Sequence, residues 1–450
     1  MKKAKVYLLS LGCSRNLVDS EIILGVLKDN NYSLTFDLKE ATVAILNTCC
    51  FIDEAKEETI EYIFELVNLK KQKRLKKILV IGCFPQRYAK NIQEEIPEVD
   101  GLITFDRYLD IHKAIDEVLA GKKVYWLKKN PQFLYNHKMP RFLLTPAHYA
   151  YIKISEGCNH NCSFCIIPKI KGKYRSRKIE SILYEAESLI KKGVKEIILI
   201  GQDTSAYGID IYKKPQLDRL LKEIVKLKDL RWLRVLYTHP AYFNDALIES
   251  IKKYDNICKY ADIPLQHINQ KILKLMARTP APNRILKLIK KLRKEIPGIA
   301  IRTSLIVGFP EETESDFKEL IDFVKEVKFE RLGAFKYSKE EGTRAYNFKK
   351  QVPDKIKQQR FKRIMEIQRD ISSQINKKFL GKKMDIIIDE KATHEKNLYL
   401  GRTQYDAPEV DGMVYLKAES QEIKPGDIIP AVITDTYEYD LVAEPYSVKR

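Results

Sequence analysis

Short apolar segments alternate with amphipathic helical stretches over most of this chain, and this alternation restricts the fold more than any other feature. Before residue 140, three of the apolar segments are 6–11, 42–46 and 78–81. Strands that alternate with helices are typical of βαβ units, whose strands run parallel in one sheet. The sequence therefore predicts an N-terminal parallel α/β domain over residues 1–140.

Each of these three segments leads directly to a cysteine, namely Cys13, Cys49 and Cys83. The carboxyl ends of parallel strands lie along one edge of a sheet, where ligands bind, so we expect the three thiols to converge. A single cysteine is most often a small buried hydrophobic residue, but three in the same structural position favour a metal site. We expect Cys50 to point elsewhere and Cys258 to be structural.

A second series of strand–helix repeats follows a polar linker around Pro140. The six expected strands lie at 151–155, 196–200, 232–237, 260–264, 300–307 and 333–337. Six such repeats in about 200 residues predict an open, partial parallel (β/α) barrel. We assign this barrel, together with a long basic helix expected over 353–380, to a domain at residues 145–378.

The pattern changes again after residue 380. Short β-type runs at 384–388, 413–416 and 428–434 are separated by Gly, Pro and Asp turns, which predicts a small antiparallel β-barrel over residues 381–450. The chain of 450 residues is long enough for about three domains of this kind. The predicted fold class is therefore α/β, with a small β-barrel at the C-terminal end.

The first strand of the predicted partial barrel leads into a cysteine triplet, Cys158, Cys162 and Cys165. Thiolates at this spacing select a soft metal, either zinc or the iron of an iron–sulfur cluster. A structural zinc site needs a fourth protein ligand, for which His160 is a candidate. A cubane on three cysteines instead leaves one iron open to a small molecule. The position after a barrel strand, where barrel active sites lie, argues against structural zinc.

The triplet, with Phe164 before its last cysteine, resembles the cluster motif of the radical S-adenosylmethionine (SAM) superfamily. The flanking stretches 148–154, 166–168 and 172–177 are similar to the methylthiotransferase branch. The three upstream cysteines also stand in the Leu-Gly-Cys, Asn-Thr-Cys and Gly-Cys contexts of that branch. This resemblance covers essentially the whole chain.

Two substrates compete within the branch: an adenosine of transfer RNA, and an aspartate on the small-subunit ribosomal protein at the decoding centre. The stretches 201–208, 337–343 and 401–412 resemble the second kind of enzyme, the RimO-type methylthiotransferases. That resemblance implies methylthiolation of the aspartate β-carbon, and it implies that the C-terminal barrel is TRAM-like.

The charge distribution bears on the same choice. The chain carries a net charge of +19, which favours an anionic partner and possible RNA contact through a basic surface. Residues 381–450, however, contain nine Lys and Arg against fourteen Asp and Glu, so this part is −5 and the rest is +24. A β-barrel that binds RNA should be basic, because it contacts phosphates. An acidic barrel instead complements a basic ribosomal protein or an assembling ribosome.

The resemblance implies a division of labour between two [4Fe–4S] clusters. Cys158, Cys162 and Cys165 would be the catalytic triplet, whose cluster binds SAM and, after one-electron reduction, generates a 5′-deoxyadenosyl radical. Cys13, Cys49 and Cys83 would hold a second cluster that delivers the sulfur. An electron donor such as flavodoxin or ferredoxin is then required, because the cofactor supplies the redox chemistry and the protein positions it.

Further cofactor contacts are expected where predicted barrel strands end. The candidates beside Phe164 are Gln202, Asp203, Gln266, Arg302 and Gly308. A glycine at position 308 lets the backbone approach a ligand closely, although an ordinary strand-to-helix turn explains it equally well. Arg302 lies nearer the start of its strand than the end, and the neighbouring His267 could be a core histidine.

A different class of function is a non-catalytic zinc- or RNA-binding module. Eight cysteines in 450 residues are too few for a disulfide scaffold and indicate metal or redox chemistry in a cytoplasmic protein. No apolar run approaches the length of about 20 residues that a membrane span needs, so no membrane partner is expected.

Overall fold

The computed structural model describes residues 4–393, 395–418 and 422–446, so the outer ends of the first and last predicted domains lie outside the described residues. The chain forms two compact units that do not follow its linear order. Unit 1 contains residues 1–144, 153–182 and 338–346, and unit 2 contains 145–152, 183–337 and 347–450. The division into three sequential domains stays a prediction.

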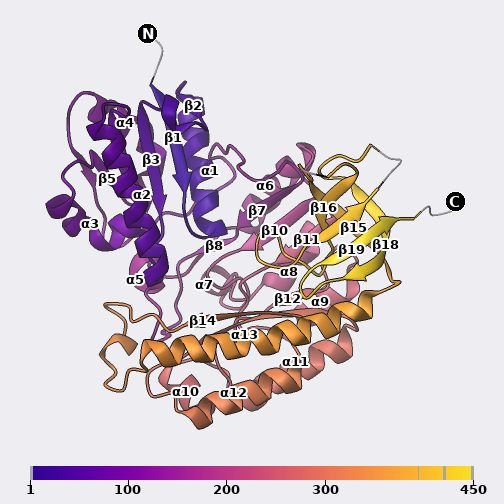
Figure 1. The fold of residues 1–450 in the computed structure, drawn as a ribbon. Coiled ribbons are helices and arrows are strands. Elements are labelled where there is room, and N and C mark those ends of the chain that lie inside the picture. The colour runs from indigo at the N-terminus through magenta and orange to yellow at the C-terminus, as the bar shows by residue number, and fades with distance from the viewer. Residues whose placement is uncertain (1–3, 394, 419–421, 447–450) are drawn as a thin grey trace. The chain divides into compact units, whose positions relative to one another are not determined.

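Unit 1 is built on a six-stranded parallel sheet, coloured indigo to purple in Figure 1, with the strand order β2-β1-β3-β4-β5-β6. The strands are β1 (Lys5–Ser10), β2 (Ser33–Thr35), β3 (Val43–Thr48), β4 (Lys77–Gly82), β5 (Gly101–Ile103) and β6 (Val124–Trp126). The three predicted strands are β1, β3 and β4, and they are direct neighbours. β3 is buried along its whole length, as expected for an apolar strand covered on both faces.

Most helices of unit 1 begin at or shortly after a cysteine. These are α1 (Ser14–Asp29), α2 (Asp53–Lys71), α3 (Cys83–Glu95) and the short α5 (Ile167–Lys171), whereas α4 (Ile111–Leu119) begins far from any cysteine in the sequence. Cys13 immediately precedes α1, and Cys83 is the first residue of α3. The antiparallel pair β8 (Ser155–Glu156) and β9 (Arg175–Ser176) flanks the triplet segment.

Unit 2 contains six parallel barrel strands in two three-stranded sheets, with the orders β11-β10-β7 and β12-β13-β14. The strands are β7 (Tyr149–Lys153, whose last residue belongs to unit 1), β10 (Glu196–Ile200), β11 (Trp232–Val235), β12 (Tyr260–Asp262), β13 (Ala300–Val307) and β14 (Arg331–Lys336). Backbone hydrogen bonds join β11 to the residues before β12, as in Cys258 N–H to Leu233 O at 3.0 Å. All six predicted barrel strands are confirmed, with small shifts of their ends.

Helices separate these strands as the sequence predicts. They are α6 (Ile179–Lys191), α7 (Ile209–Tyr212), α8 (Leu217–Ile224), α9 (Asp245–Lys253), α10 (Gln270–Leu275), α11 (Pro282–Glu295) and α12 (Glu314–Val327). The start of α12 is fixed by a capping box, in which Thr313 and Asp316 satisfy each other's backbone N–H groups. No helix in the described part of the chain combines the length and the apolarity that a membrane crossing requires.

The predicted long helix is α13 (Asp354–Asn376), which packs against β14 and α12 and runs across the foreground of Figure 1. Ile364, Ile371 and Ile375 form its buried stripe, and the helix gives way to a 3₁₀ turn at Lys377–Phe379. It therefore ends a few residues before the predicted boundary at 380.

The C-terminal part of unit 2 is a closed five-stranded barrel in the order β15-β16-β17-β19-β18. Its strands are β15 (Lys383–Lys391), β16 (Leu398–Arg402), β17 (Val414–Lys417), β18 (Ile428–Thr436) and β19 (Leu441–Pro445). Side chains such as Ile386, Val414, Leu416 and Ile433 fill its interior. The predicted small barrel is confirmed, and one of its strand pairs, β17 with β19, is parallel.

A loop of this small barrel binds the first residues of the larger barrel's strands through buried charges. Arg402 Nη1 lies 2.8 Å from Glu196 Oε2, at the start of β10. Asp406 accepts a hydrogen bond from Arg331 Nε at 3.0 Å, at the start of β14. Asp411 accepts one from Tyr260 Oη at 2.6 Å, at the start of β12. The loop thus closes the amino end of the partial barrel, opposite the end where barrel enzymes carry their chemistry.

Candidate metal centres

The first candidate centre lies at the carboxyl edge of the sheet in unit 1. Cys13 follows β1, Cys49 follows β3 and Cys83 follows β4, and these strands are adjacent. The strand order β2-β1-β3 reverses between β1 and β3, which makes this edge a topological switch point, the usual ligand site of such sheets. We call these three cysteines the N-terminal triad. The structure confirms that their strands bring them to one place.

Buried polar side chains fix the three strand ends relative to one another. Asn16 Nδ2 donates to Leu11 O at 3.0 Å and to Thr48 O at 2.8 Å. Thr48 Oγ1 donates to Ile81 O at 2.6 Å and accepts from the N–H of Phe84 at 3.1 Å. Through Asn16 and Thr48, buried hydrogen bonds join the chain after β1 to the end of β3, and the end of β3 to β4 and α3, so this network sets the spacing of the triad.

Gly12 permits the close approach of two triad segments. Its φ of +86° lies in the left-handed region, and a Cβ at this position would lie 2.6 Å from Cys49 Cβ and 3.0 Å from Cys49 Sγ. Any other residue would therefore push Cys49 away from the segment that carries Cys13. The Leu-Gly-Cys pattern has a steric reason at this site.

The pKa values of the three thiols show that they share one environment. Burial alone would raise the pKa of Cys13, but the Arg15 guanidinium and the N–H of Asn16 outweigh it and lower that pKa. Burial and the Cys13 thiolate raise the pKa of Cys49. Burial raises the pKa of Cys83 well above its usual value, against the opposing charge of Lys171. Thiols that destabilise one another's ionised forms fit a site completed by a cationic metal or cluster.

The second candidate centre is the triplet loop, also in unit 1. Cys158, Cys162 and Cys165 are all half-buried and lie between β8 and α5, outside regular secondary structure. The N–H of His160 donates to Cys158 Sγ at 3.4 Å, the type of hydrogen bond that tunes the sulfur ligands of an iron–sulfur cluster. Phe164 is half-buried in the same loop.

A segment from beyond the last barrel strand, residues 338–346, belongs to unit 1 and contacts both cysteine regions. The N–H of Ala345 donates to Ser163 O at 2.8 Å, inside the triplet loop. Glu340 is buried and receives Arg87 Nη1 at 2.6 Å and Lys56 Nζ at 3.2 Å. Arg87 also donates to Cys50 O at 3.1 Å. The RimO-like stretch 337–343 therefore supports the backbone next to Cys49.

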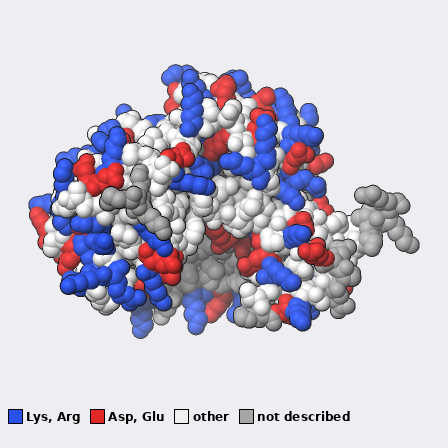
Figure 2. All heavy atoms as spheres, turned by 90° about the horizontal axis from the view of Figure 1, so that it is seen from above, with Lys and Arg blue, Asp and Glu red and all other residues white. Residues whose placement is uncertain are grey.

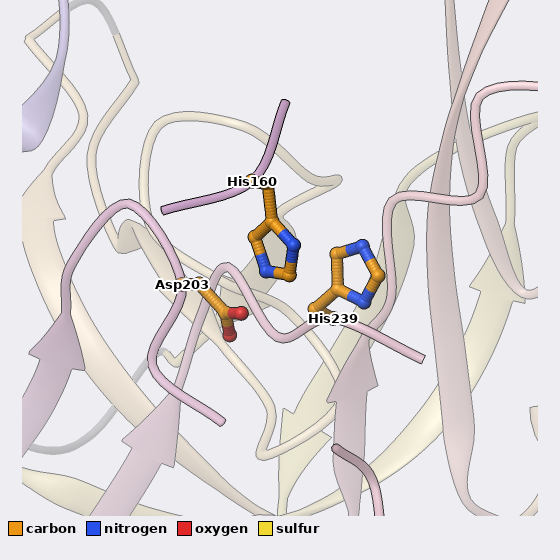
Figure 3. Close-up of side chains that lie close together, drawn as sticks. All are labelled: His160, Asp203 and His239. Atoms are coloured by element: carbon orange, nitrogen blue, oxygen red, sulfur yellow. The ribbon is translucent and has the colours of Figure 1, made fainter. Parts of the chain in front are cut away.

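Within unit 2, the predicted contacts Gln202 and Asp203 follow β10. Asp203 is buried, and its carboxylate accepts from Ser205 Oγ at 2.6 Å. Ser205 Oγ also accepts from the N–H of His239 at 2.8 Å, so the loops after β10 and β11 are joined. Figure 3 shows Asp203 and His239 on these two loops, whereas His160, labelled in the same view, belongs to unit 1.

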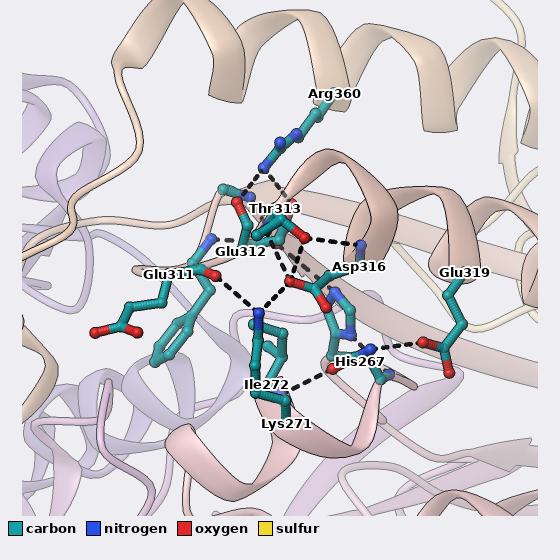
Figure 4. A network of polar contacts seen from close by, with 12 residues as sticks. His267, Lys271, Ile272, Glu311, Glu312, Thr313, Asp316, Glu319 and Arg360 are labelled. Atoms are coloured by element: carbon teal, nitrogen blue, oxygen red, sulfur yellow. Dashed lines mark hydrogen bonds and ion pairs between the residues drawn. The ribbon is translucent and has the colours of Figure 1, made fainter.

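Gly308 directly follows β13 with a φ of +70°. Its N–H donates to Glu312 Oε2 at 3.0 Å. Arg360 of α13 binds Glu312 Oε1 at 2.8 Å, in the polar network drawn in Figure 4. A Cβ at Gly308 would lie 2.3 Å from Lys357 Cγ, so the stem of that lysine occupies the room that the glycine leaves. The glycine thus has a packing reason, and its contact with a cofactor stays a prediction.

His267 and Arg302 have structural partners. Burial lowers the pKa of His267 to about 3, and its Nδ1 accepts from the N–H of Asn269 at 2.9 Å, so it is a neutral core histidine. Arg302 Nη1 lies 3.1 Å from Asp262 Oδ1, and its Nε lies 3.4 Å from Asp411 Oδ1. Asp262 belongs to β12 and Asp411 to the small barrel, so both partners hold Arg302 near the start of its strand. Its contact with a cofactor stays a prediction.

The predicted contact Gln266 follows β12 in a strained turn. Its φ is +74°, and its backbone bridges to β13 through Gln266 N–H to Ser304 O and Ile306 N–H to Gln266 O, both at 2.8 Å. A non-glycine residue in the left-handed region is uncommon and is often found at functional sites. Its role as a cofactor contact stays a prediction.

Comparison with known proteins agrees with this architecture. Family models match residues 152–324 (radical SAM superfamily), 5–104 (uncharacterized protein family UPF0004) and 380–445 (TRAM domain). A protein of Clostridioides difficile (strain 630) named ribosomal protein uS12 methylthiotransferase RimO is 46% identical over 98% of this chain and 98% of its own length. One of the same name from Caldanaerobacter subterraneus subsp. tengcongensis is 48% identical over 98% and 99%. The chain belongs to the RimO family.

Membership makes the chain a radical SAM methylthiotransferase, and the superfamily match supports a [4Fe–4S] cluster and SAM as cofactors. Among solved structures, the radical SAM methyltransferase TsrM from Kitasatospora setae, with cobalamin and a [4Fe–4S] cluster bound, has a TM-score of 0.54 at 14% identity and covers 74% of this chain and 75% of its own. The radical enzyme OxsB has a TM-score of 0.52 at 12% identity, covering 81% and 56%. These two structures show the shared fold alone.

Sequence reasoning missed the side chains that organise the N-terminal triad. Asn16 and Thr48 tie the strand ends, and Arg15 lowers the pKa of Cys13. Asn and Thr stand within or next to the cysteine motifs, so their proximity was the available signal. Lys171 had no such signal, because it lies far from Cys83 in the sequence and meets it only through the fold.

Proposed function

We propose that this RimO-family enzyme methylthiolates the β-carbon of an aspartate on ribosomal protein uS12, at the decoding centre of the small subunit, with two [4Fe–4S] clusters. The observation that carries the proposal is the near-full-length similarity to proteins named ribosomal protein uS12 methylthiotransferase. The convergence of Cys13, Cys49 and Cys83 at a switch point adds physical support for the second cluster.

Each triad has a separate task. Cys158, Cys162 and Cys165 would hold the cluster that, together with SAM, would supply the radical chemistry needed to take hydrogen from an unactivated carbon. Cys13, Cys49 and Cys83 would hold the second cluster as the source of the transferred sulfur. The protein's own work is to fix these ligands, orient the target side chain and exclude water. The proposed cofactor contacts remain Phe164, Gln202, Asp203, Gln266, Arg302 and Gly308.

The substrate is a basic ribosomal protein or the assembling ribosome. The acidic charge of the small barrel supports this substrate less than the sequence suggests. Three of its carboxylates form ion pairs with arginines of the same chain and are not available to a partner: Asp389, Asp406 and Asp411. On its described surface, six exposed lysines face eight exposed acids, a nearly balanced total. The proposal therefore rests on the family resemblance, with charge as a minor aid.

RNA contact is a secondary part of the proposal. Figure 2 shows lysine and arginine spread over one face among acidic residues rather than gathered in a single patch. Such a surface favours weak, salt-dependent association with an anionic assembly. The enzyme would act in the cytoplasm and take electrons from a small donor of the flavodoxin or ferredoxin class.

Mass spectrometry of cells that lack this gene tests the substrate. We expect uS12 to lose a methylthio group from one aspartate, while the transfer-RNA nucleosides keep theirs. Loss from an adenosine with uS12 unchanged would instead establish the transfer-RNA activity. Anaerobic reconstitution tests the cofactors: two cubanes of iron and sulfide per chain are expected, and zinc with no cleavage of SAM would establish a non-catalytic module.

A further inference from the structure

Four charged side chains form a closed, buried ionic cluster inside unit 1: Asp19, Lys153, Glu156 and Lys171. Their side chains are 1%, 1%, 5% and 4% exposed. Lys153 Nζ pairs with Asp19 and lies 2.6 Å from Glu156 Oε2. Lys171 Nζ lies 3.2 Å from Asp19 Oδ2 and 3.8 Å from Glu156 Oε1. Each cation contacts both anions, so the quartet is neutral as a whole.

The quartet joins the chain segments that carry the two triads. Asp19 lies in α1, which starts directly after Cys13. Lys153 and Glu156 lie in β7 and β8, which lead into Cys158, and Lys171 ends α5, which starts soon after Cys165. The four side chains thus hold both ends of the triplet loop against the helix that begins at the N-terminal triad.

Lys171 also places its charge at the N-terminal triad. Helix α5 packs against α3, whose first residue is Cys83, and Lys171 Nζ lies 3.6 Å from the centroid of the Phe105 ring. Its ammonium is the first group that opposes the burial effect on the Cys83 thiol. Burial disfavours its charge, but Glu156 and Asp19 outweigh burial and raise its pKa, so Lys171 stays protonated.

Stability alone is a poor reason for such a quartet. Buried ion pairs lose several kcal/mol of hydration per ion, and well-packed apolar side chains in their place are often as stable or more stable. A charge kept at this cost next to metal-ligating thiols points to a role toward what those thiols hold.

We propose that Lys171, held by Asp19 and Glu156, couples the two cysteine triads: it positions the triplet loop against the N-terminal domain and sets a permanent positive charge beside the N-terminal triad. It is a positioning residue, because it acts through the cysteines rather than on the substrate. The inference rests on the proposed function in one respect, since it requires the N-terminal triad to hold a redox-active cluster.

The charge has a measurable consequence with a definite sign. A nearby cation stabilises the more negative, reduced form of a cluster and so raises its reduction potential, and a nearby anion lowers it. The potential of the N-terminal cluster can be measured alone in full-length chains that carry Cys158→Ala, Cys162→Ala and Cys165→Ala. In that background we would compare Lys171→Met, Asp19→Asn and the double variant. Lys173→Met is the matched control, because Lys173 is exposed and follows α5 closely.

We expect Lys171→Met to lower the potential and Asp19→Asn to raise it, with the double variant between them and Lys173→Met unchanged. Lys171→Arg should restore the wild-type potential, since it keeps the charge. If Lys171→Met leaves an unpaired buried charge and does not fold, the double variant still keeps the balanced Lys153–Glu156 pair. Its potential relative to Asp19→Asn then measures Lys171 by itself.

Shifts of the same sign in both single variants, or no shift in either, would overturn the inference, because a merely structural role predicts no dependence on the sign of the removed charge. The outcome is separable from the proposed function. A wild-type chain that binds only one cluster would refute the two-cluster proposal, whereas two clusters with charge-independent potentials would refute the role of Lys171 alone.

Discussion

The two cysteine triads of unit 1 are built in opposite ways. The triplet is local: three half-buried thiols on one loop, with backbone groups such as the N–H of His160 close to the sulfur. The N-terminal triad is assembled by the fold, from three strand ends that buried side chains such as Asn16 and Thr48 tie together. A local motif keeps its shape when distant contacts change. A site assembled by a sheet depends on every contact that sets the strand ends.

The largest expected effect separates the tasks of the two triads. Replacing Cys158, Cys162 and Cys165 by Ala should abolish both reductive cleavage of SAM and methylthio transfer, because the radical source is lost. Replacing the N-terminal triad by Ala should abolish transfer but leave cleavage measurable as 5′-deoxyadenosine. Liquid chromatography of the nucleoside and mass spectrometry of a uS12 peptide check both activities.

Cys50→Ala is the matched control for this comparison. Cys50 follows Cys49 and is fully buried, and burial together with the Cys49 thiolate raises the pKa of its thiol to about 12. Cys50 lies outside the Leu-Gly-Cys, Asn-Thr-Cys and Gly-Cys contexts of the N-terminal triad, so the variant should keep both activities. Loss of cleavage on replacing the N-terminal triad would show instead that the six cysteines form one interdependent site.

The second prediction concerns a variant that disturbs the N-terminal triad without replacing a cysteine. Thr48→Val removes the hydrogen bonds to Ile81 O and from Phe84 N–H. Leaving these buried backbone groups unpaired should cost about 1–3 kcal/mol of unfolding free energy. The variant should also bind one cubane where wild type binds two, since the ends of β3 and β4 separate. Denaturant unfolding of the apo chain and iron analysis measure these effects.

Thr42→Val makes the same replacement just before the other end of β3, where the side chain is half-exposed, and should change neither quantity by much. Equal iron loss in both variants would mean that the strand as a whole, rather than its carboxyl end, supports the site.

The parts of the molecule that were predictable follow the same distinction. The periodicity and spacing of apolar residues predicted β1, β3, β4, the six barrel strands and α13. Buried strands and amphipathic helices require apolar residues at regular positions, so their burial is visible in the local sequence. The short strands β2, β5 and β6, which lie toward the two sides of the sheet, were not predicted. Three residues carry too little periodicity, and these strands exist because the sheet supplies partners.

At the candidate sites, the six cysteines were predictable from chemistry and position, whereas their supporting residues were not. Glu340 meets Arg87, and Lys171 meets Asp19, across more than a hundred residues of chain. The residues around each member of such a pair carry no signal that identifies its partner. Arg302 could be picked out as a polar residue on a barrel strand, but its partner Asp411, far away in the sequence, could not.

A third, smaller effect follows from the solvent exposure of the thiols. In the N-terminal triad Cys13 and Cys49 are half-buried and Cys83 is 8% exposed, whereas all three thiols of the triplet are half-buried. A chelator should therefore remove iron from the triplet a few-fold faster, since solvent access controls attack on a cluster. Variants that retain only one triad allow each loss to be followed by absorbance. Faster loss from the N-terminal triad would show that its strand-end network opens more readily than the loop.

The smallest effect concerns a single charge at the N-terminal triad. Although burial opposes it, Arg15 lowers the pKa of Cys13, whereas the pKa values of Cys49 and Cys83 are raised. Because the thiolate is the reactive form, Cys13 of the apo chain should be alkylated fastest of the three near neutral pH. Arg15→Gln should raise the Cys13 pKa and move its alkylation profile to higher pH. The rate at neutral pH should fall by up to about tenfold, the change in thiolate that one pKa unit produces.

Arg15→Lys keeps the cation and should keep most of the rate. Peptide mass spectrometry after timed alkylation resolves the three thiols, and an unchanged Cys13 profile in Arg15→Gln would assign the lowered pKa to the N–H of Asn16 at the start of α1.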